Sequence, residues 1–315
     1  MWIPGGTLRI ELNQHDAGKR LDHAVHRHFP QVSRARVQDW IKHGRVLVNG
    51  NASRASYIVR LPDSIDVEPA DPAPFRATPE QIPLTILYED PDVVAIDKPA
   101  GMVVHSGAGV HSGTLVNALL HHFHQLSQTA GELRPGIVHR LDRYTSGVLL
   151  VARNDAAHQR LAEQFAGRQV EKTYLALVHG KLKEDRGRIE KPIARDPRQR
   201  IRMTARLAHG RAAWSEYHVL RRFDGFTFLE IRIGTGRTHQ IRVHLASIGH
   251  PVVGDRLYGA PAKIGSAPTL ARYFLHAHRI KFHQPSTGEP VTVESPLPAD
   301  LEAWLSQLSA SAPPR

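Results

Sequence analysis

The stretch HRLDRYTSG at 139–147 places one carboxylate, Asp142, between two arginines and runs directly into the apolar segment VLLVA at 148–152. Two neighbouring cations favour the ionised form of a carboxylate. A loop that leads into a buried strand also gives the side chain a rigid mounting. Most Asp residues between arginines are solvated charges or caps, so this stretch alone only suggests covalent or electrostatic work on a substrate.

Two further motifs follow in order, EKTYLALVHG at 171–180 and TGRTHQIRVHLASIGHPVVGDRLYG at 235–259. With GIVHRLDRYTSG at 136–147 they make the chain resemble the RluA-type family of pseudouridine synthases, from about residue 84 to about residue 298. The segment VVHSGAGVHSGTLVNALLHH at 103–122 is most similar to the RluD-like branch, which acts on large-subunit ribosomal RNA. The resemblance implies an RNA isomerase that flips and modifies specific uridines in 23S-type RNA.

Composition limits the alternatives. The chain has 315 residues, 41% of them hydrophobic, which is enough for one or two globular domains. The net charge of +11 favours a polyanionic partner such as RNA. The chain has no cysteine, which excludes disulfides, thiolate metal sites and cysteine nucleophiles. The start MWIPGGTLRIEL lacks the basic and apolar regions of a signal peptide, and no apolar run is long enough to span a bilayer, so we expect a cytoplasmic protein without a membrane partner.

The first part of the chain predicts a small RNA-binding module at 19–68, after an N-terminal extension at 1–18. Helices are expected in KRLDHAVHRHF and SRARVQDWIKHG, the second with Ser33 as N-cap and Gly44 just past its end. Strand-like VLVNG and DSIDVE follow, and the pattern resembles the S4 RNA-binding domain. Leu61-Pro62-Asp63-Ser64 departs from the Gly-Asp common in the last turn of that family, which puts local RNA contacts there in doubt.

From Lys19 to Arg60, nine basic residues face only Asp22 and Asp39. This surplus favours phosphate contact over a merely solvated face. The candidate RNA-binding residues are Lys19, Arg20, Arg34, Arg36, Lys42 and Arg45.

A proline-rich linker is expected at 69–83, then a catalytic domain at 84–306 and a disordered tail at 307–315. LTILYEDPDVVAIDKP predicts a hairpin, Thr114 caps a helix, and Asn154 or Asp155 caps another that ends near Gly167. The strand-like runs KTYLALVHG, WSEYHVLRRF and FTFLEIRI outnumber the helices. The fold class is therefore α+β, an S4-type module followed by a mixed, mainly antiparallel sheet.

Pseudouridine formation breaks a C–N glycosidic bond and joins C5 of uracil to the same ribose, so it needs a carboxylate and no redox or metal cofactor. Asp142 matches the family's catalytic Asp, either as nucleophile or as base and electrostatic partner. The resemblance implies that Arg242 forms a salt bridge with Asp142, although spacing alone would make it a solvated helix arginine, with Thr238 as N-cap.

The resemblance also assigns the substrate cavity. Tyr174, by position an ordinary core residue of a strand, would stack on the target uracil and assist proton removal, with Ile241 on the other side. Arg140 would fill the gap left by the flipped base or contact phosphate. His139 and Thr145 complete the expected substrate-binding set. Tyr144 stands where relatives commonly carry an acid, so substrate choice is open to change there.

The 21 histidines do not predict a metal site. His239 and His244 are five residues apart on an expected helix, and His121, His122 and His124 have no nearby carboxylate. The segment 194–214 carries six arginines against Asp196, which predicts a flexible loop on RNA phosphates or, alternatively, a solvated loop.

We expect a cofactor-free, metal-free monomer whose partner is ribosomal RNA or the pre-ribosomal large subunit. The alternative is a non-catalytic ribosome-associated RNA-binding protein, which the joint presence of Asp142, Tyr174 and Arg242 disfavours. A hydrolase using the same Asp would need a positioned water and a second carboxylate, which is not adjacent in sequence.

Overall fold

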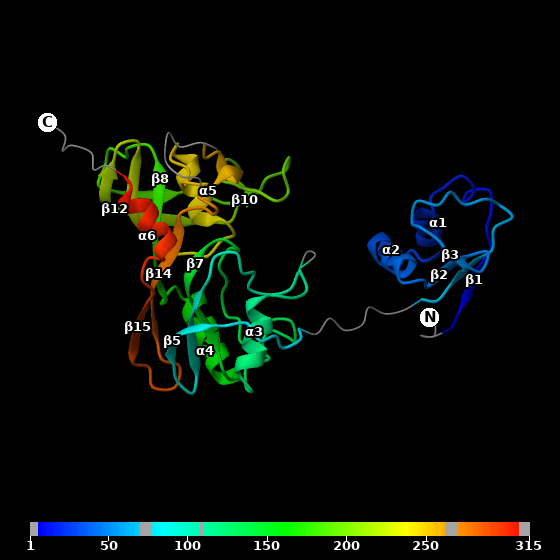
Figure 1. Ribbon diagram of the computed structural model, residues 1–315, viewed down its shortest axis with the longest axis horizontal. Coiled ribbons are helices and arrows are strands. Elements are labelled where there is room, and N and C mark those ends of the chain that lie inside the picture. Colours follow the sequence, from blue (N-terminus) through cyan, green and yellow to red (C-terminus); the bar gives the residue numbers. More distant parts are fainter. Residues whose placement is uncertain (1–5, 70–76, 108–109, 262–269, 309–315) are drawn as a thin grey trace. The chain divides into compact units, whose positions relative to one another are not determined.

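The structure is a computed structural model that describes residues 6–69, 77–107, 110–261 and 270–308. The chain divides into two compact units, residues 1–75 and 76–315 (Figure 1). No helix in these described ranges is long and apolar enough to cross a membrane.

The N-terminal unit packs two helices on a small sheet with strand order β1-β4-β2-β3. Its elements are β1 (Leu8–Ile10), α1 (Leu21–His28), α2 (Arg34–Lys42), β2 (Val46–Val48), β3 (Asn51–Ala52) and β4 (Ile65–Val67). Ser33 Oγ accepts the Arg36 N–H at the start of α2, and Gly44 takes φ +72° after its end, as predicted. Val37, Trp40 and Ile41 are buried in the core of this unit.

Part of the segment predicted as an N-terminal extension belongs to this unit. Leu8–Ile10 form β1, which pairs antiparallel with β4. Asp16 is fully buried and accepts hydrogen bonds from Arg27 and the backbone of Asn13. A three-residue strand with one buried side chain is too short to show alternation in the sequence, which is why the prediction missed it.

The second unit is built on a nine-stranded sheet with strand order β5-β6-β7-β14-β8-β13-β12-β9, and β15 pairs with β14. Among the named strands of its described residues, only β7 and β14 pair in parallel. The sheet strands are β5 (Thr85–Glu89), β6 (Val93–Lys98), β7 (Ser146–Ala152), β8 (Glu171–His179), β9 (Arg186–Glu190), β12 (Trp214–Phe223), β13 (Phe226–Ile233), β14 (Leu275–His283) and β15 (Pro290–Glu294). The predicted α+β class with a mainly antiparallel sheet is confirmed.

Four helices accompany this sheet in the described residues: α3 (Leu115–His122), α4 (Asp155–Ala166), α5 (Gln240–Ser247) and α6 (Ala299–Ser306). In Figure 1, α3 and α4 lie toward one end of this unit with β5, and α5 lies toward the other end with β8. Helix α4 contacts β7, and α5 contacts β12. The predicted caps are confirmed, because Thr114 forms a capping box with Asn117 and Asn154 accepts the Ala157 N–H.

All seven residues of β7 are buried, so the strand after the Asp142 loop is a core element. Gly147 has φ +112°, and a Cβ there would collide with the backbone of Ala277 on β14. The close parallel pairing of β7 and β14 therefore requires glycine at this position.

Two segments differ from their predictions. Residues 77–83, predicted as linker, lie against α3, where Asn117 Nδ2 donates to the Thr78 carbonyl (2.7 Å) and His122 Nε2 lies 2.8 Å from the Ile82 carbonyl. The predicted loop at 194–214 contains a two-stranded hairpin, β10 (Ala194–Arg195) and β11 (Met203–Thr204). Of the predicted tail, 309–315 lie outside the described residues, while Leu308 packs against the core.

Candidate active site

Asp142 lies in the loop that leads into β7, and hydrogen bonds to two successive backbone carbonyls fix this loop. The Thr145 N–H donates to the Asp142 carbonyl at 3.1 Å. The carbonyl of the next residue, Arg143, accepts the Gly101 N–H (2.8 Å) and the Lys98 ammonium (3.2 Å). The carboxylate therefore has a rigid mounting, while its side chain stays 22% exposed.

Lys98 is fully buried beneath this loop at the end of β6. Besides the Arg143 carbonyl, its Nζ donates to the carbonyls of Pro99 (2.8 Å) and Met102 (3.0 Å). Three acceptors match the three protons of an ammonium group. Burial nevertheless lowers the pKa of Lys98 to about 7.

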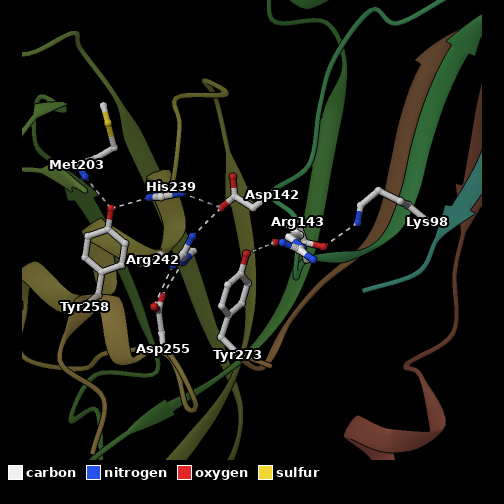
Figure 2. A network of polar contacts seen from close by, with 10 residues as sticks. Lys98, Asp142, Arg143, Met203, His239, Arg242, Asp255, Tyr258 and Tyr273 are labelled. Atoms are coloured by element: carbon white, nitrogen blue, oxygen red, sulfur yellow. Dashed lines mark hydrogen bonds and ion pairs between the residues drawn. The ribbon is translucent and has the colours of Figure 1, made fainter. Parts of the chain in front are cut away.

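Arg242 connects Asp142 to a second, buried carboxylate (Figure 2). Its Nη1 lies 3.1 Å from Asp142 Oδ2, while Nε and Nη2 donate to the two oxygens of Asp255 at 2.6 and 3.0 Å. Burial by itself lowers the pKa of Arg242, but the hydrogen bonds with Asp255 outweigh it and hold the pKa above its usual value. Asp255 thus orients the guanidinium so that one edge remains for Asp142.

The position of Arg242 differs from the sequence prediction in one respect. It is 5% exposed, with its guanidinium over the rings of Tyr273 (4.2 Å) and Tyr258 (5.1 Å), and does not face out of the core as expected. The predicted cap Thr238 is also wrong. His239 stands at the N-cap position with φ +55°, its side chain makes no capping hydrogen bond, and α5 starts at Gln240.

The structure brings most of the predicted substrate residues to one cavity beside Asp142. Arg140, Thr145, Tyr174 and Ile241 line this cavity together with the carboxylate. Tyr174 is 8% exposed, and burial, with the Asp142 charge added, raises its pKa above the usual range. Its hydroxyl is therefore protonated at neutral pH, and the ring offers an aromatic face and a hydrogen-bond donor.

A second cavity of about 700 Å³ adjoins the first and shares Arg140, Asp142 and Arg242 with it. Tyr144 lines this cavity, 41% exposed, with the Arg143 guanidinium 5.3 Å from its ring. Arg140 is exposed where the two cavities meet, which suits either contact with phosphate or entry into an RNA helix.

His139 requires a correction, because its side chain does not line either cavity. Its Nε2 accepts the Leu150 N–H at 2.8 Å, and the ring packs on Phe165 of α4 at 4.8 Å. Because its ring nitrogen accepts a hydrogen bond from the β7 backbone, His139 has a structural role in the fold. Thr145 does line the first cavity, and its Oγ1 lies 3.3 Å from the Tyr273 hydroxyl.

Several residues of this site were not predicted from the sequence. Asp255 and Tyr258 lie around the short helix η1 (Arg256–Tyr258), inside the quoted motif 235–259, where the acid and the aromatic residue were the available signals. Asp255 is 2% exposed and bonds Arg242 with both oxygens, so it is not free to activate a water as a hydrolase would need. No group of three or more His, Asp or Glu suited to a metal occurs in the part of the chain described.

Some of the predicted RNA-binding residues of the N-terminal unit form ion pairs with carboxylates of the same unit. Asp22, fully buried, lies 2.9 Å from Arg20 Nε and 3.6 Å from Arg34 Nε. Arg45 pairs with Glu68 at 3.2 Å, Arg36 is half-buried, and Lys19 and Lys42 are exposed. Arg20 and Arg34 remain about half exposed, so their outer edges are accessible to a polyanion.

Comparison with known proteins agrees with this geometry. The family model described as RNA pseudouridylate synthase matches residues 92–247, and the S4 domain model matches residues 19–65. An RNA pseudouridine synthase of Bacillus subtilis is 42% identical over 301 residues, covering 96% of this chain and 98% of the relative. Ribosomal large subunit pseudouridine synthase D of Xanthomonas campestris is 44% identical over 93% of this chain and 89% of its own length.

Solved structures give the same result for the catalytic unit. Human RNA pseudouridylate synthase domain containing 1 superposes with a TM-score of 0.58 at 28% identity, over 78% of this chain and 93% of that one. With the motifs, both domain matches and relatives aligned over nearly their whole length, the chain belongs to the RNA pseudouridine synthase family, as an isomerase with an N-terminal S4 domain.

Proposed function

We propose that this enzyme isomerises uridines of large-subunit ribosomal RNA, and that the reaction depends on Asp142. The observation that carries the role of Asp142 is the buried fork of Arg242, which is fixed by Asp255 and presents its remaining edge to Asp142 beside the cavity. The substrate class is supported by relatives from Xanthomonas campestris and Nitrosomonas europaea, both named ribosomal large subunit pseudouridine synthase D.

The chemistry needs no outside electrons. The bond from ribose C1′ to uracil N1 breaks, the base turns, and a bond from C1′ to C5 forms. The proton on C5 leaves and N1 gains one, so atoms and charge balance. Asp142 supplies the negative charge, either by attacking the sugar or by stabilising the positive charge that develops on it.

The residues around Asp142 match the other demands of this reaction. The face of Tyr174 and the side chain of Ile241 bound the cavity and suit a flat uracil removed from its stack. Tyr174, with its pKa raised, donates a hydrogen bond and does not act as a free phenolate. Arg140, exposed at the cavity, either contacts phosphate or occupies the vacated stack.

The N-terminal unit would hold the RNA through its exposed basic residues, with Lys19 and Lys42 the most accessible. The expected partner of the enzyme is ribosomal RNA or the pre-ribosomal large subunit. We propose that the enzyme binds this partner as a monomer.

The test of the substrate is a map of pseudouridines in RNA from a strain that lacks this protein. We expect specific pseudouridines to disappear from large-subunit ribosomal RNA and to return when the wild-type protein is restored. An unchanged ribosomal map combined with losses in transfer RNA would contradict the substrate assignment.

A further inference from the structure

His239 has an unusual backbone conformation at the active site. Its φ of +55° is left-handed, a conformation shared among the described non-glycine residues only by Asn49 and Arg168. Such a conformation is unfavourable for a residue with a side chain, so surrounding contacts must hold it. No side-chain capping bond holds it, and its backbone carbonyl accepts the Val243 N–H at 2.9 Å as the first acceptor of α5.

Two contacts of the imidazole accompany this conformation (Figure 2). Its Nδ1 lies 2.8 Å from the Tyr258 hydroxyl, and its Nε2 lies 4.0 Å from Asp142 Oδ2. The ring thus connects a buried tyrosine to the carboxylate proposed to act on the substrate.

The direction of the protons follows from the third member of this chain. The backbone N–H of Met203, on β11, donates to the Tyr258 hydroxyl oxygen at 2.9 Å. The other hydrogen-bond partner of this hydroxyl within the described residues is His239 Nδ1, so the hydroxyl proton has one acceptor available. Donation to Nδ1 leaves the imidazole proton on Nε2, facing Asp142.

The ionisation of both groups agrees with this direction. Burial raises the pKa of Tyr258 to about 12, so the hydroxyl keeps its proton at neutral pH. Burial lowers the pKa of His239, which outweighs the opposite effect of Asp142, so the imidazole is neutral and has one N–H to donate.

We propose that Tyr258 and His239 are positioning residues, in which Tyr258 fixes the imidazole tautomer and the Nε2–H of His239 faces Asp142 Oδ2 across 4.0 Å and orients the carboxylate electrostatically. The opposite tautomer would turn a lone pair toward the carboxylate and repel it. Arg242 and His239 both approach Oδ2, which leaves Oδ1 for the substrate. This inference rests on the proposed role of Asp142.

The arrangement also ties the site to the hairpin of β10 and β11. Met203 supplies the N–H that directs Tyr258, and the guanidinium of Arg202 lies 5.4 Å from the Tyr258 ring. Arg242 lies 5.1 Å from the same ring. The His239 tautomer with its proton on Nε2 therefore depends on the position of this basic hairpin beside Tyr258.

The first experiment reads the tautomer directly in the full-length protein without RNA. Nitrogen-15 NMR of the histidine rings distinguishes a ring nitrogen that bears a proton from one that bears a lone pair, and loss of the signal in His239→Asn assigns it. We expect a neutral ring with the proton on Nε2. A proton on Nδ1, or a doubly protonated ring at neutral pH, would overturn the proposal.

The second experiment is Tyr258→Phe, which keeps the ring on Arg242 and removes only the hydroxyl. We expect a mixture of tautomers and a single-turnover rate lower by about tenfold at saturating RNA, equivalent to one hydrogen bond, with the Kd for RNA within about twofold. The matched control for the NMR signal is Tyr273→Phe, which removes another buried hydroxyl beside Arg242, one that lies 3.3 Å from Thr145 Oγ1; it should leave the tautomer unchanged.

A third variant tests whether the two effects share one cause. His239→Gln places an amide donor near the position of Nε2 and has no tautomer to fix, so adding Tyr258→Phe should cost little further rate. A tautomer change without a rate change, a rate loss without a tautomer change, or an equal rate loss in the His239→Gln background would overturn the proposal. If Asp142→Asn were active while the tautomer was as predicted, the role of Asp142 would fail separately.

Discussion

The pair formed by Arg242 and Asp255 permits a quantitative test, because it separates stability from catalysis. Arg242 is 5% exposed and Asp255 is 2% exposed, and two hydrogen bonds join them. Removing one partner of a buried ion pair leaves an uncompensated charge and costs about 3–5 kcal/mol. Replacing both partners with apolar residues of similar volume is often nearly neutral.

The structure sets an order for the single variants. Arg242→Met leaves the carboxylate of Asp255 buried and unpaired, so we expect the full loss of about 3–5 kcal/mol in the free energy of unfolding. Asp255→Leu leaves Arg242 its contact with Asp142, which is 22% exposed, so we expect a smaller loss, at or below about 3 kcal/mol. The double variant should fall within about 1–2 kcal/mol of the wild type, well below the sum of the two single losses, so the two residues are coupled.

The assay is urea unfolding of the full chain. The free energy of unfolding is taken from the transition of the catalytic unit, and variants are compared only where the dependence of that free energy on urea concentration is unchanged. Single-turnover rates of pseudouridine formation are measured on the same samples. The double variant should recover stability while its rate stays low, because Asp142 has lost its cation. A double variant as unstable as the sum of the two single variants would refute the buried-pair reasoning.

Three other properties of the site and the N-terminal unit can be tested separately. Arg140→Lys removes the planar group, so it should slow reaction on a uridine in a rigid stem-loop more than on one in unstructured RNA of matched sequence; equal slowing would make Arg140 a phosphate contact. Burial lowers the pKa of Lys98 to about 7. Between about pH 7 and pH 10, Lys98 is therefore protonated in the unfolded chain and deprotonated in the folded protein. This difference should make the free energy of unfolding increase with pH in that range. Urea unfolding at pH 7 and pH 9 should show a smaller increase in Lys98→Met, and an unchanged increase would contradict the assignment to Lys98. Removal of residues 1–75 should weaken binding to long ribosomal RNA. The slope of the salt dependence of binding should fall by about 0.7–0.9 for each phosphate that the truncated protein no longer binds. Equal binding at every salt concentration would mean that the basic residues are only solvated.

The sequence predicted elements whose determinants are local. The caps Ser33, Thr114 and Asn154 stand directly before their helices, and each accepts the backbone N–H expected of a cap. The alternation around Leu229 and Ile231 predicted β13 for the same reason, since both side chains are buried and their neighbours are not.

Contacts between distant segments were not accessible in this way. Asp255 bonds Arg242 because η1 packs beside α5, and although both residues lie in the motif 235–259, their spacing does not indicate this contact. Thr238 has the residue type of an N-cap, but the left-handed turn at His239 moves the start of the helix past it. The motif predicts His139 as a substrate residue, but its ring accepts a hydrogen bond from the backbone N–H of Leu150 in β7.

The dependence of the reaction on Asp142 is tested by the amount of pseudouridine that Asp142→Asn forms under single-turnover conditions. The amide preserves the shape of the side chain and removes the charge that Arg242 binds at 3.1 Å. We expect no detectable product, with RNA affinity and the unfolding transition close to those of the wild type. Activity above a few percent of the wild-type rate in a folded, RNA-binding variant would show that Asp142 does not carry the reaction.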